Sequence, residues 1–261
     1  MAFALPHART PRFGVPAEPF RVTTADGVDL VGASIGRPRP GVVLCHGFDA
    51  WHGKPRCARL AAWLSDRFTV YVFDFRGHGR SGGQSSFGGL EVNDVGAVVA
   101  RARQDGHDPV AAIGASMGGI AVIRHAAILG GVDAVVAVST PARWDGHRSA
   151  AVRRMAWLTG TAQGRRLGRV AGVRLPSEWV RTEAPGEVVG KIAPVPLLLV
   201  HGRDDHFFDE EEAWRLYRAA GEPKALWLAD RFGHAEDGFS LPFAERVGRF
   251  LYRTWGLEWP G

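Results

Sequence analysis

The stretch Pro109-Val-Ala-Ala-Ile-Gly-Ala-Ser-Met-Gly-Gly119 decides the fold. Its apolar first half predicts a buried strand, its Gly-Ala-Ser-Met-Gly centre a sharp turn, and the apolar periodicity of residues 120–129 a helix. A serine on such a turn is pushed out of the sheet edge with its Oγ exposed, and glycines flank it because a Cβ would collide with neighbouring backbone. Ser116 is therefore a candidate nucleophile. A G-x-S-x-G pattern alone is common in a chain with 34 glycines, so its partners must be found downstream.

Strand and helix signals alternate on both sides of this turn. The dipeptide Asp26-Gly27 between two apolar segments predicts an antiparallel hairpin at the start of the sheet. Later apolar runs alternate with helical patterns, which indicates parallel strands joined by right-handed crossovers. The expected strands are 20–24, 28–33, 42–45, 68–73, 109–115, 132–138, 195–200 and 225–228, and the expected helices are 55–65, 90–104, 120–129, 210–219 and 243–254. The pattern predicts an α/β protein with a mostly parallel central sheet and helices on both faces.

The alternation stops between Thr140 and Pro194. A connection of this size without strands is usually a functional cover or binding loop, so residues 141–193 are interpreted as a small helical cap inserted in the domain. The run Arg153-Arg154-Met-Ala-Trp157-Leu158 predicts one short amphipathic helix in it. We therefore expect an N-terminal arm at 1–19 and a single α/β domain over 20–261.

The composition and net charge exclude several classes of function. Apolar residues at 46% and charged residues at 23% are typical of a globular protein with a full core. The arm has no continuous apolar core, and no run approaches membrane-spanning length, so we expect a cytoplasmic protein without a secretory signal. The net charge is +5, but the arginines are scattered without a nucleic-acid motif, so a solvated basic surface is expected and no nucleic-acid partner. Cys45 and Cys57 are expected to be reduced and buried.

A serine nucleophile needs a base within hydrogen-bond reach, and the base needs an orienting acid. In an open parallel sheet, only residues just after the strands converge on one site. His234 follows the last expected strand and is the candidate base, whereas the other histidines near strand ends have plainer roles in loops. Asp204 and Asp205 both follow the preceding strand and are both candidates for the acid. Asp74 is expected to hydrogen-bond its own loop.

The chain resembles the α/β-hydrolases, and most of all the bacterial serine esterases and lipases related to monoacylglycerol lipases and S33 peptidases. The motifs that carry the resemblance are His46-Gly-Phe48, Asp74-Phe-Arg-Gly-His-Gly-Arg-Ser81, Gly114-Ala-Ser-Met-Gly118, and Gly202-Arg-Asp-Asp205 followed by Gly233-His234. In that family the acid is the last residue of a G-x-x-D pattern, which implies Asp205. The resemblance also implies that the N–H groups of Phe48 and Met117 form the oxyanion hole.

The implied activity is hydrolysis of small to medium acyl or aryl carboxylic esters through an acyl-enzyme. A thioesterase or acyltransferase using the same residues, and a binding protein that retains the fold without turnover, remain alternatives. A serine at the turn, instead of an aspartate, argues against the alkyl-displacing members of the fold. We expect a small-molecule ester substrate and neither a metal nor another cofactor; the oligomeric state stays open.

Aromatic residues predict an apolar substrate pocket over Ser116, although the same side chains would equally pack the cap onto the sheet. The candidates for the pocket are Trp51, Trp144, Trp157 and Phe207. Arginines make the cap basic, which either favours an anionic substrate or forms a solvated face, the plainer interpretation. They are Arg143, Arg148, Arg153, Arg154, Arg165, Arg166 and Arg169.

Overall fold

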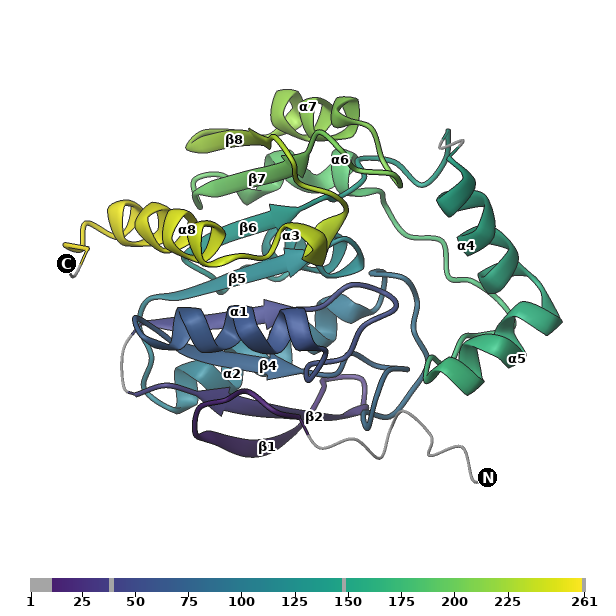
Figure 1. Ribbon diagram of the computed structural model, residues 1–261, viewed down its shortest axis with the longest axis horizontal. Coiled ribbons are helices and arrows are strands. Elements are labelled where there is room, and N and C mark those ends of the chain that lie inside the picture. The colour runs from purple at the N-terminus through teal and green to yellow at the C-terminus, as the bar shows by residue number, and fades with distance from the viewer. Residues whose placement is uncertain (1–10, 38–39, 147–148, 260–261) are drawn as a thin grey trace.

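The computed structural model describes residues 11–37, 40–146 and 149–259. Its centre is an eight-stranded sheet in the order β1-β2-β4-β3-β5-β6-β7-β8 (Figure 1). The strands are β1 (Ala17–Thr23), β2 (Asp29–Ile35), β3 (Gly41–Cys45), β4 (Thr69–Phe73), β5 (Val110–Ala115), β6 (Ala134–Val138), β7 (Leu197–Gly202) and β8 (Lys224–Ala229). β1 and β2 form the expected antiparallel hairpin, β2 also runs antiparallel to β4, and all other neighbours are parallel. The expected α/β-hydrolase architecture is confirmed.

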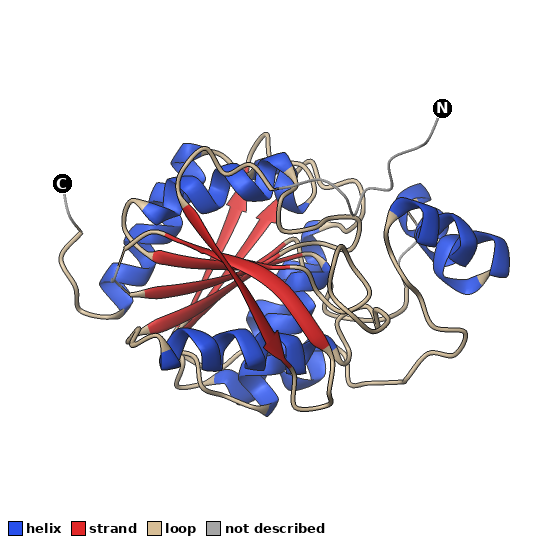
Figure 2. Ribbon diagram, turned by 90° about the horizontal axis from the view of Figure 1, so that it is seen from below, coloured by secondary structure: helices blue, strands red, loops and turns tan. Residues whose placement is uncertain are grey.

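Helices cover both faces of the sheet (Figure 2). One face packs against α1 (Pro55–Ser65) and α8 (Leu241–Thr254), and the other against α2 (Glu91–Gln104), α3 (Met117–Ile128) and α7 (Glu210–Ala219). Along β3, for example, Val43 faces the second group of helices, whereas Val42 and Leu44 face the first. Because both faces of the inner strands β3 to β7 are buried, these strands are apolar almost throughout.

The segment between β6 and β7 leaves the layers and carries α4 (Ala150–Gly160) and α5 (Ala162–Ala171), which stand together at one side of the molecule (Figures 1 and 2). An extended stretch then leads to α6 (Pro185–Val188) and a 3₁₀ turn at Val189–Ile192. The sequence pattern predicts α4 but not α5. Thr161 separates them because its backbone is extended, and its hydroxyl accepts the Gly164 N–H at 3.0 Å, which caps α5.

The extended stretch is attached to the body of the molecule by backbone hydrogen bonds. Arg174 N–H donates to Gly77 O at 2.7 Å, and Ser85 N–H donates to Arg174 O at 2.8 Å. Of the expected arm 1–19, residues 1–10 lie outside the described residues, and Ala17 already begins β1. Cys45 and Cys57 are both free and buried, as expected. In the described part of the chain, no helix has the length and apolarity needed to cross a membrane.

Candidate active site

Ser116 occupies a strained turn between the end of β5 and the start of α3. Its φ of 52° lies in the region that side chains other than glycine rarely adopt. The turn is held by Ser116 N–H, which donates to Val138 O at 2.8 Å. A Cβ on Gly114 would lie 2.2 Å from Gly118 O, and one on Gly118 would lie 2.4 Å from Cys45 O. The glycines of the motif are therefore required by the close approach of backbone segments.

Three side chains form a continuous hydrogen-bond chain at the carboxyl ends of β5, β7 and β8. His234 Nε2 lies 3.0 Å from Ser116 Oγ, and His234 Nδ1 lies 2.8 Å from Asp205 Oδ2. The Asp205 side chain is fully buried, whereas the His234 side chain is 11% exposed. With Nδ1–H donated to the carboxylate, Nε2 is left free to accept the proton of the serine hydroxyl. This is the geometry that activates a serine.

The structure brings Asp205, and not Asp204, to the histidine. Asp204 is exposed, and its N–H donates to Phe232 O. Burial alone would raise the pKa of Asp205, but the hydrogen bond and electrostatic interaction with His234, with the N–H groups of Phe207 and Phe208 on Oδ1, hold that pKa below its usual value. The carboxylate therefore stays ionised while it orients the imidazole.

Parallel pairing of β3 and β5 brings the loop His46-Gly47-Phe48 beside Ser116. Cys45 pairs with Gly114, so the loop after β3 and the turn after β5 leave the same edge of the sheet. Met117 is the first residue of α3, where backbone N–H groups have no acceptor inside the helix. Gly47, Phe48 and Ser116 all line the same cleft. The two segments that carry the N–H groups expected to bind an oxyanion therefore leave the sheet at the same edge as Ser116.

Side chains from distant segments fix the loop after β3. Gly47 N–H donates to Glu236 Oε1 at 2.8 Å. His46 Nδ1 donates to Gly47 O at 2.7 Å, and its Nε2 accepts the Phe75 N–H at 3.1 Å. Burial lowers the pKa of His46 to about 3, so the ring is neutral and keeps this donor and acceptor pattern. His78 Nε2 lies 2.6 Å from Phe48 O. These contacts pre-position the loop.

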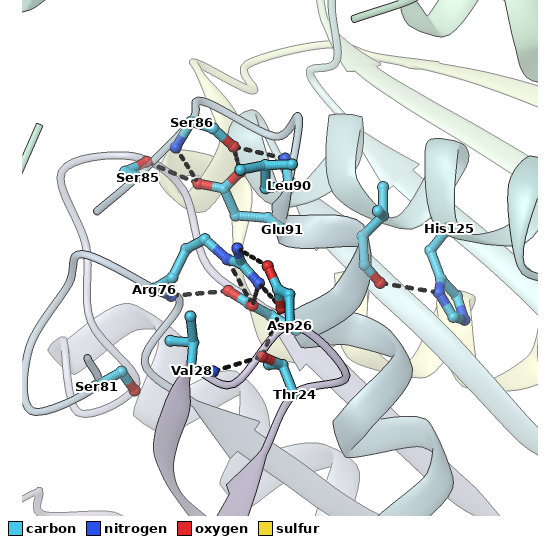
Figure 3. A network of polar contacts seen from close by, with 12 residues as sticks. Thr24, Asp26, Val28, Arg76, Ser81, Ser85, Ser86, Leu90, Glu91 and His125 are labelled. Carbon is cyan, nitrogen blue, oxygen red and sulfur yellow. Dashed lines mark hydrogen bonds and ion pairs between the residues drawn. The ribbon is translucent and has the colours of Figure 1, made fainter. Parts of the chain in front are cut away.

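The Asp74 to Ser81 motif also has a structural role, as expected for Asp74. Asp74 Oδ1 accepts from His52 Nδ1 at 2.6 Å, and Oδ2 accepts the Arg80 N–H at 2.9 Å. Although burial acts to raise its pKa, the contacts with His52 hold the pKa of Asp74 at about 2. Arg76 hydrogen-bonds Asp26 of the hairpin (Figure 3) and also Asp94 of α2. The loop after β4 is therefore pinned to elements on both of its sides.

Glu91 organises the next segment of the cleft wall (Figure 3). Its fully buried carboxylate accepts from Ser85 Oγ and Ser86 N–H, both at 2.8 Å, and from Gly88 N–H at 2.9 Å. Phe87, between these residues, has a φ of 60°. Ser86 and Phe87 line the cleft, so a buried carboxylate below them fixes part of its surface.

A cleft of about 1950 Å³ lies over Ser116 and His234. Its walls come from the loops after the strands, from one side of α4 and from the extended stretch at 179–184. Phe207 packs over the His234 ring with 4.3 Å between ring centroids. Trp144 lines the cleft and donates its indole N–H to Thr182 O at 2.7 Å. Of the aromatic residues expected in the pocket, Trp144 and Phe207 therefore do line it.

Trp51 and Trp157 do not line the cleft, which corrects the expectation for both. The chain turns after Asp49, and Trp51 packs against His52 at 5.7 Å between ring centroids, beside a separate cavity of about 30 Å³. Trp157 is 50% exposed, because the positions of α4 that line the cleft are Val152, Met155, Ala156 and Thr159. A residue two positions after Met155 points to the opposite side of the helix.

The cap arginines largely form a solvated face. Arg143 lines the cleft, but its guanidinium pairs with Glu212 at 3.0 Å. Among the residues that the structure describes, the other arginines of the set do not line the cleft: Arg153, Arg154, Arg165, Arg166 and Arg169. Arg148 lies outside the described residues. Also within the described ranges, no group of three or more His, Cys, Asp or Glu side chains is arranged to hold a metal ion.

Sequence reasoning missed Glu236 and Glu91. Glu236 lies two residues after His234, in a 3₁₀ turn, and Glu91 begins α2. Acidic residues in the first turn of a helix are usually explained by the helix dipole, so neither position stands out in a sequence. Only the three-dimensional structure shows that both carboxylates accept hydrogen bonds from loops around the serine.

Comparison with known proteins places the chain among hydrolases. Residues 36–184 match the family model described as serine aminopeptidase, S33. The chain is 31% identical over 192 residues to the uncharacterized protein YfhR of Escherichia coli K12, which covers 69% of the chain and 58% of the relative. It is 28% identical over 227 residues to YqkD of Bacillus subtilis, covering 83% and 72%. The chain thus matches little more than half the length of YfhR.

Solved structures share the fold. The Pyrococcus furiosus esterase Pf2001 superposes with a TM-score of 0.75 at 23% identity, covering 94% of this chain and 95% of the esterase. The α/β hydrolase GrgF from Penicillium superposes with a TM-score of 0.72 at 19% identity, covering 93% and 100%. At these identities the likeness shows the architecture alone. The family match, which spans more than half of the chain, shows that this protein belongs to the serine aminopeptidase S33 family of α/β-hydrolases.

Proposed function

We propose that this protein is a serine hydrolase that cleaves carboxylic esters with small to medium acyl or aryl groups through an acyl-enzyme. The observation that carries the proposal is the hydrogen-bond chain from Ser116 through His234 to Asp205, which opens into the cleft. In this proposal Ser116 is the nucleophile, His234 the general base and Asp205 the orienting acid. Phe48 and Met117 supply oxyanion-hole N–H groups.

The reaction begins when Ser116 Oγ attacks the ester carbonyl and His234 Nε2 takes the hydroxyl proton. Asp205 stays ionised and stabilises the imidazolium, consistent with its lowered pKa. The imidazolium then gives the proton to the leaving alkoxide as the C–O bond breaks, which leaves an acyl group on Ser116. Water repeats the sequence, with His234 as its base, and releases the acid.

The negative charge that develops on the carbonyl oxygen is stabilised by hydrogen-bond donors whose positions are fixed before the reaction. Each oxyanion-hole donor typically contributes about 3 kcal/mol to transition-state stabilisation. Backbone N–H groups serve this purpose only if their loop does not move, and the contacts of Glu236, His46 and His78 restrain that loop. The fixed loop therefore supports the assignment of Phe48 as one donor.

Aromatic side chains in the cleft support an ester with an apolar acyl or aryl group as the substrate. Phe48, Phe87 and Phe207 line the cleft together with Ser116, and Phe207 packs against the His234 ring. These rings offer apolar contact for an acyl or aryl group.

The test is a panel of p-nitrophenyl esters of increasing acyl length, with thioesters and aminoacyl arylamides as competing classes. We expect turnover of short and medium esters that is abolished in Ser116→Ala. Asp204→Asn is the matched control, because it removes a neighbouring carboxylate that does not reach His234. Preferential cleavage of the arylamides would overturn the ester assignment and favour a peptidase.

A further inference from the structure

Arginines are scattered along the whole sequence, but the excess of positive over negative charge lies in the cap. Between Gly146 and Ser177 the sequence holds seven arginines and no acidic residue. The remaining 25 lysine and arginine residues are outnumbered by the 27 acidic residues, so the rest of the chain is slightly negative although the whole carries +5. A small projecting element therefore carries all of the excess charge.

The two sides of α4 differ in what they contact. The side formed by Val152, Met155, Ala156 and Thr159 lines the cleft. Trp157 lies on the opposite side, where 50% of its surface is exposed. Packing of the cap does not explain why this large indole is half exposed, because the apolar side of α4 already faces the cleft.

The two sides of α5 also differ in what they contact. Gly164 and Gly168 are its buried positions: a Cβ on Gly164 would lie 2.5 Å from Leu158 O of α4, and one on Gly168 would lie 3.3 Å from Leu175 Cδ1. α5 therefore packs against the protein through its small residues. Leu167 and Val170 point away from this contact and are 55% and 66% exposed. The longer apolar side chains of α5 therefore face solvent, not the protein.

Arginines are interleaved with these exposed apolar side chains. Arg154, Arg166 and Arg169 are exposed, and no acidic side chain within the described ranges forms an ion pair with them. Arg203 on the body of the protein, by contrast, pairs with Glu210 at 2.8 Å. We call this surface the cap outer face; its residues are Arg154, Trp157, Arg166, Leu167, Arg169 and Val170.

We propose that the cap outer face docks on an anionic lipid surface. Basic residues mixed with Trp and Leu on exposed helical faces are the pattern that binds at the boundary between headgroups and acyl chains. Nucleic acid is disfavoured because Leu167 and Val170 offer it neither charge nor a stacking plane. A second copy of the chain is disfavoured because two such faces would bring like charges together. The proposal stands whether or not Ser116 is a nucleophile.

The experiment measures sedimentation of the full chain with vesicles of phosphatidylglycerol and phosphatidylcholine, and with vesicles of phosphatidylcholine alone. We expect binding only to the anionic vesicles, weakened between about 0.1 and about 1 M salt as the screening length shortens. The variant Arg154→Gln/Arg166→Gln/Arg169→Gln should bind on the order of 100-fold more weakly, at about five-fold per arginine.

A control variant removes the same charge from other surfaces: Arg12→Gln/Arg21→Gln/Arg253→Gln. These arginines are exposed on the body of the protein, so vesicle binding should stay within about two-fold of wild type if the charge acts locally. Equal loss in both variants would show that only net charge matters and would overturn the proposal. Circular dichroism on each variant verifies that the helices are retained.

The apolar part of the face has its own test. Leu167→Gln/Val170→Gln should weaken vesicle binding without changing the charge, and brominated acyl chains should quench wild-type fluorescence more than that of Trp157→Phe. Binding that is insensitive to Leu167→Gln/Val170→Gln and equally strong to heparin would identify a general polyanion site and contradict lipid docking. No binding to anionic vesicles at low salt would refute the proposal outright.

Discussion

Replacing Glu236 with alanine removes the side chain that anchors the loop beside Ser116. The Glu236 carboxylate accepts the buried Gly47 N–H at 2.8 Å, and this is a bond between a backbone donor and a charged acceptor. Such bonds contribute about 2 kcal/mol to stability, and the variant leaves the N–H without its acceptor. We expect the free energy of unfolding to fall by about 2 kcal/mol in urea denaturation.

The effect on catalysis should be separate from the effect on stability. Loss of one oxyanion donor costs about 100-fold in kcat, so release of the loop that carries Phe48 should lower kcat by up to this factor. KM should change little, because the apolar walls of the cleft are untouched. The assay is hydrolysis of the best ester from the panel, at a temperature well below the unfolding midpoint of the variant.

Glu236→Gln is the matched variant, because an amide oxygen keeps an acceptor for the Gly47 N–H. It should restore most of the kcat lost in Glu236→Ala. If Glu236→Ala retains wild-type kcat and stability, the loop is held by its other contacts alone, and the reasoning about this carboxylate is refuted. If Glu236→Gln is as impaired as alanine, the negative charge and not the hydrogen bond matters.

Further predictions concern the turn, the acid and the pH dependence of stability. Gly114→Ala should destabilise the fold by about 3 kcal/mol in urea denaturation, because its Cβ would lie 2.2 Å from Gly118 O; an unchanged midpoint would contradict this geometry. Asp205→Asn should lower kcat by about 10⁴-fold while Asp204→Asn leaves it near wild type, and equal effects would reverse the assignment of the acid. Burial lowers the pKa of His125 to about 4, so its protonation favours the unfolded chain. The free energy of unfolding should therefore fall as pH drops from about 6.5 towards 4, at about 1.4 kcal/mol per pH unit for this group. His125→Gln should make this dependence on pH less steep, and a variant with the wild-type dependence would show that other groups dominate.

Much of the fold was predictable because both faces of the inner strands β3 to β7 are buried. Apolar runs such as the one in β7 stand out for that reason, and the helix Pro55–Ser65 begins at a proline in its first turn. The start of α3 was less predictable: the expected helix begins at residue 120, whereas α3 begins at Met117. Gly118 and Gly119 lower helix propensity, but both are needed where α3 passes close to neighbouring segments.

The cap was harder to predict than the sheet. α5 has only two large apolar side chains, Leu167 and Val170, and packs through Gly164 and Gly168, so no apolar run marks it in the sequence. The interpretation of Trp157 as a pocket residue was wrong because aromatic composition does not tell which side of a helix meets the cleft. The positions of Ser116 and His234 were predictable because each follows a strand, whereas Glu236 reaches its partner only through tertiary packing.

The central claim is that Ser116 is an activated nucleophile, and intact mass after incubation with a fluorophosphonate tests it most directly. The probe requires an activated serine but not the natural substrate. The account predicts a single adduct on the wild-type protein that is absent from Ser116→Ala, and slower labelling in Asp205→Asn. A folded wild-type protein that forms no adduct, or an adduct that persists in Ser116→Ala, would contradict the proposed mechanism.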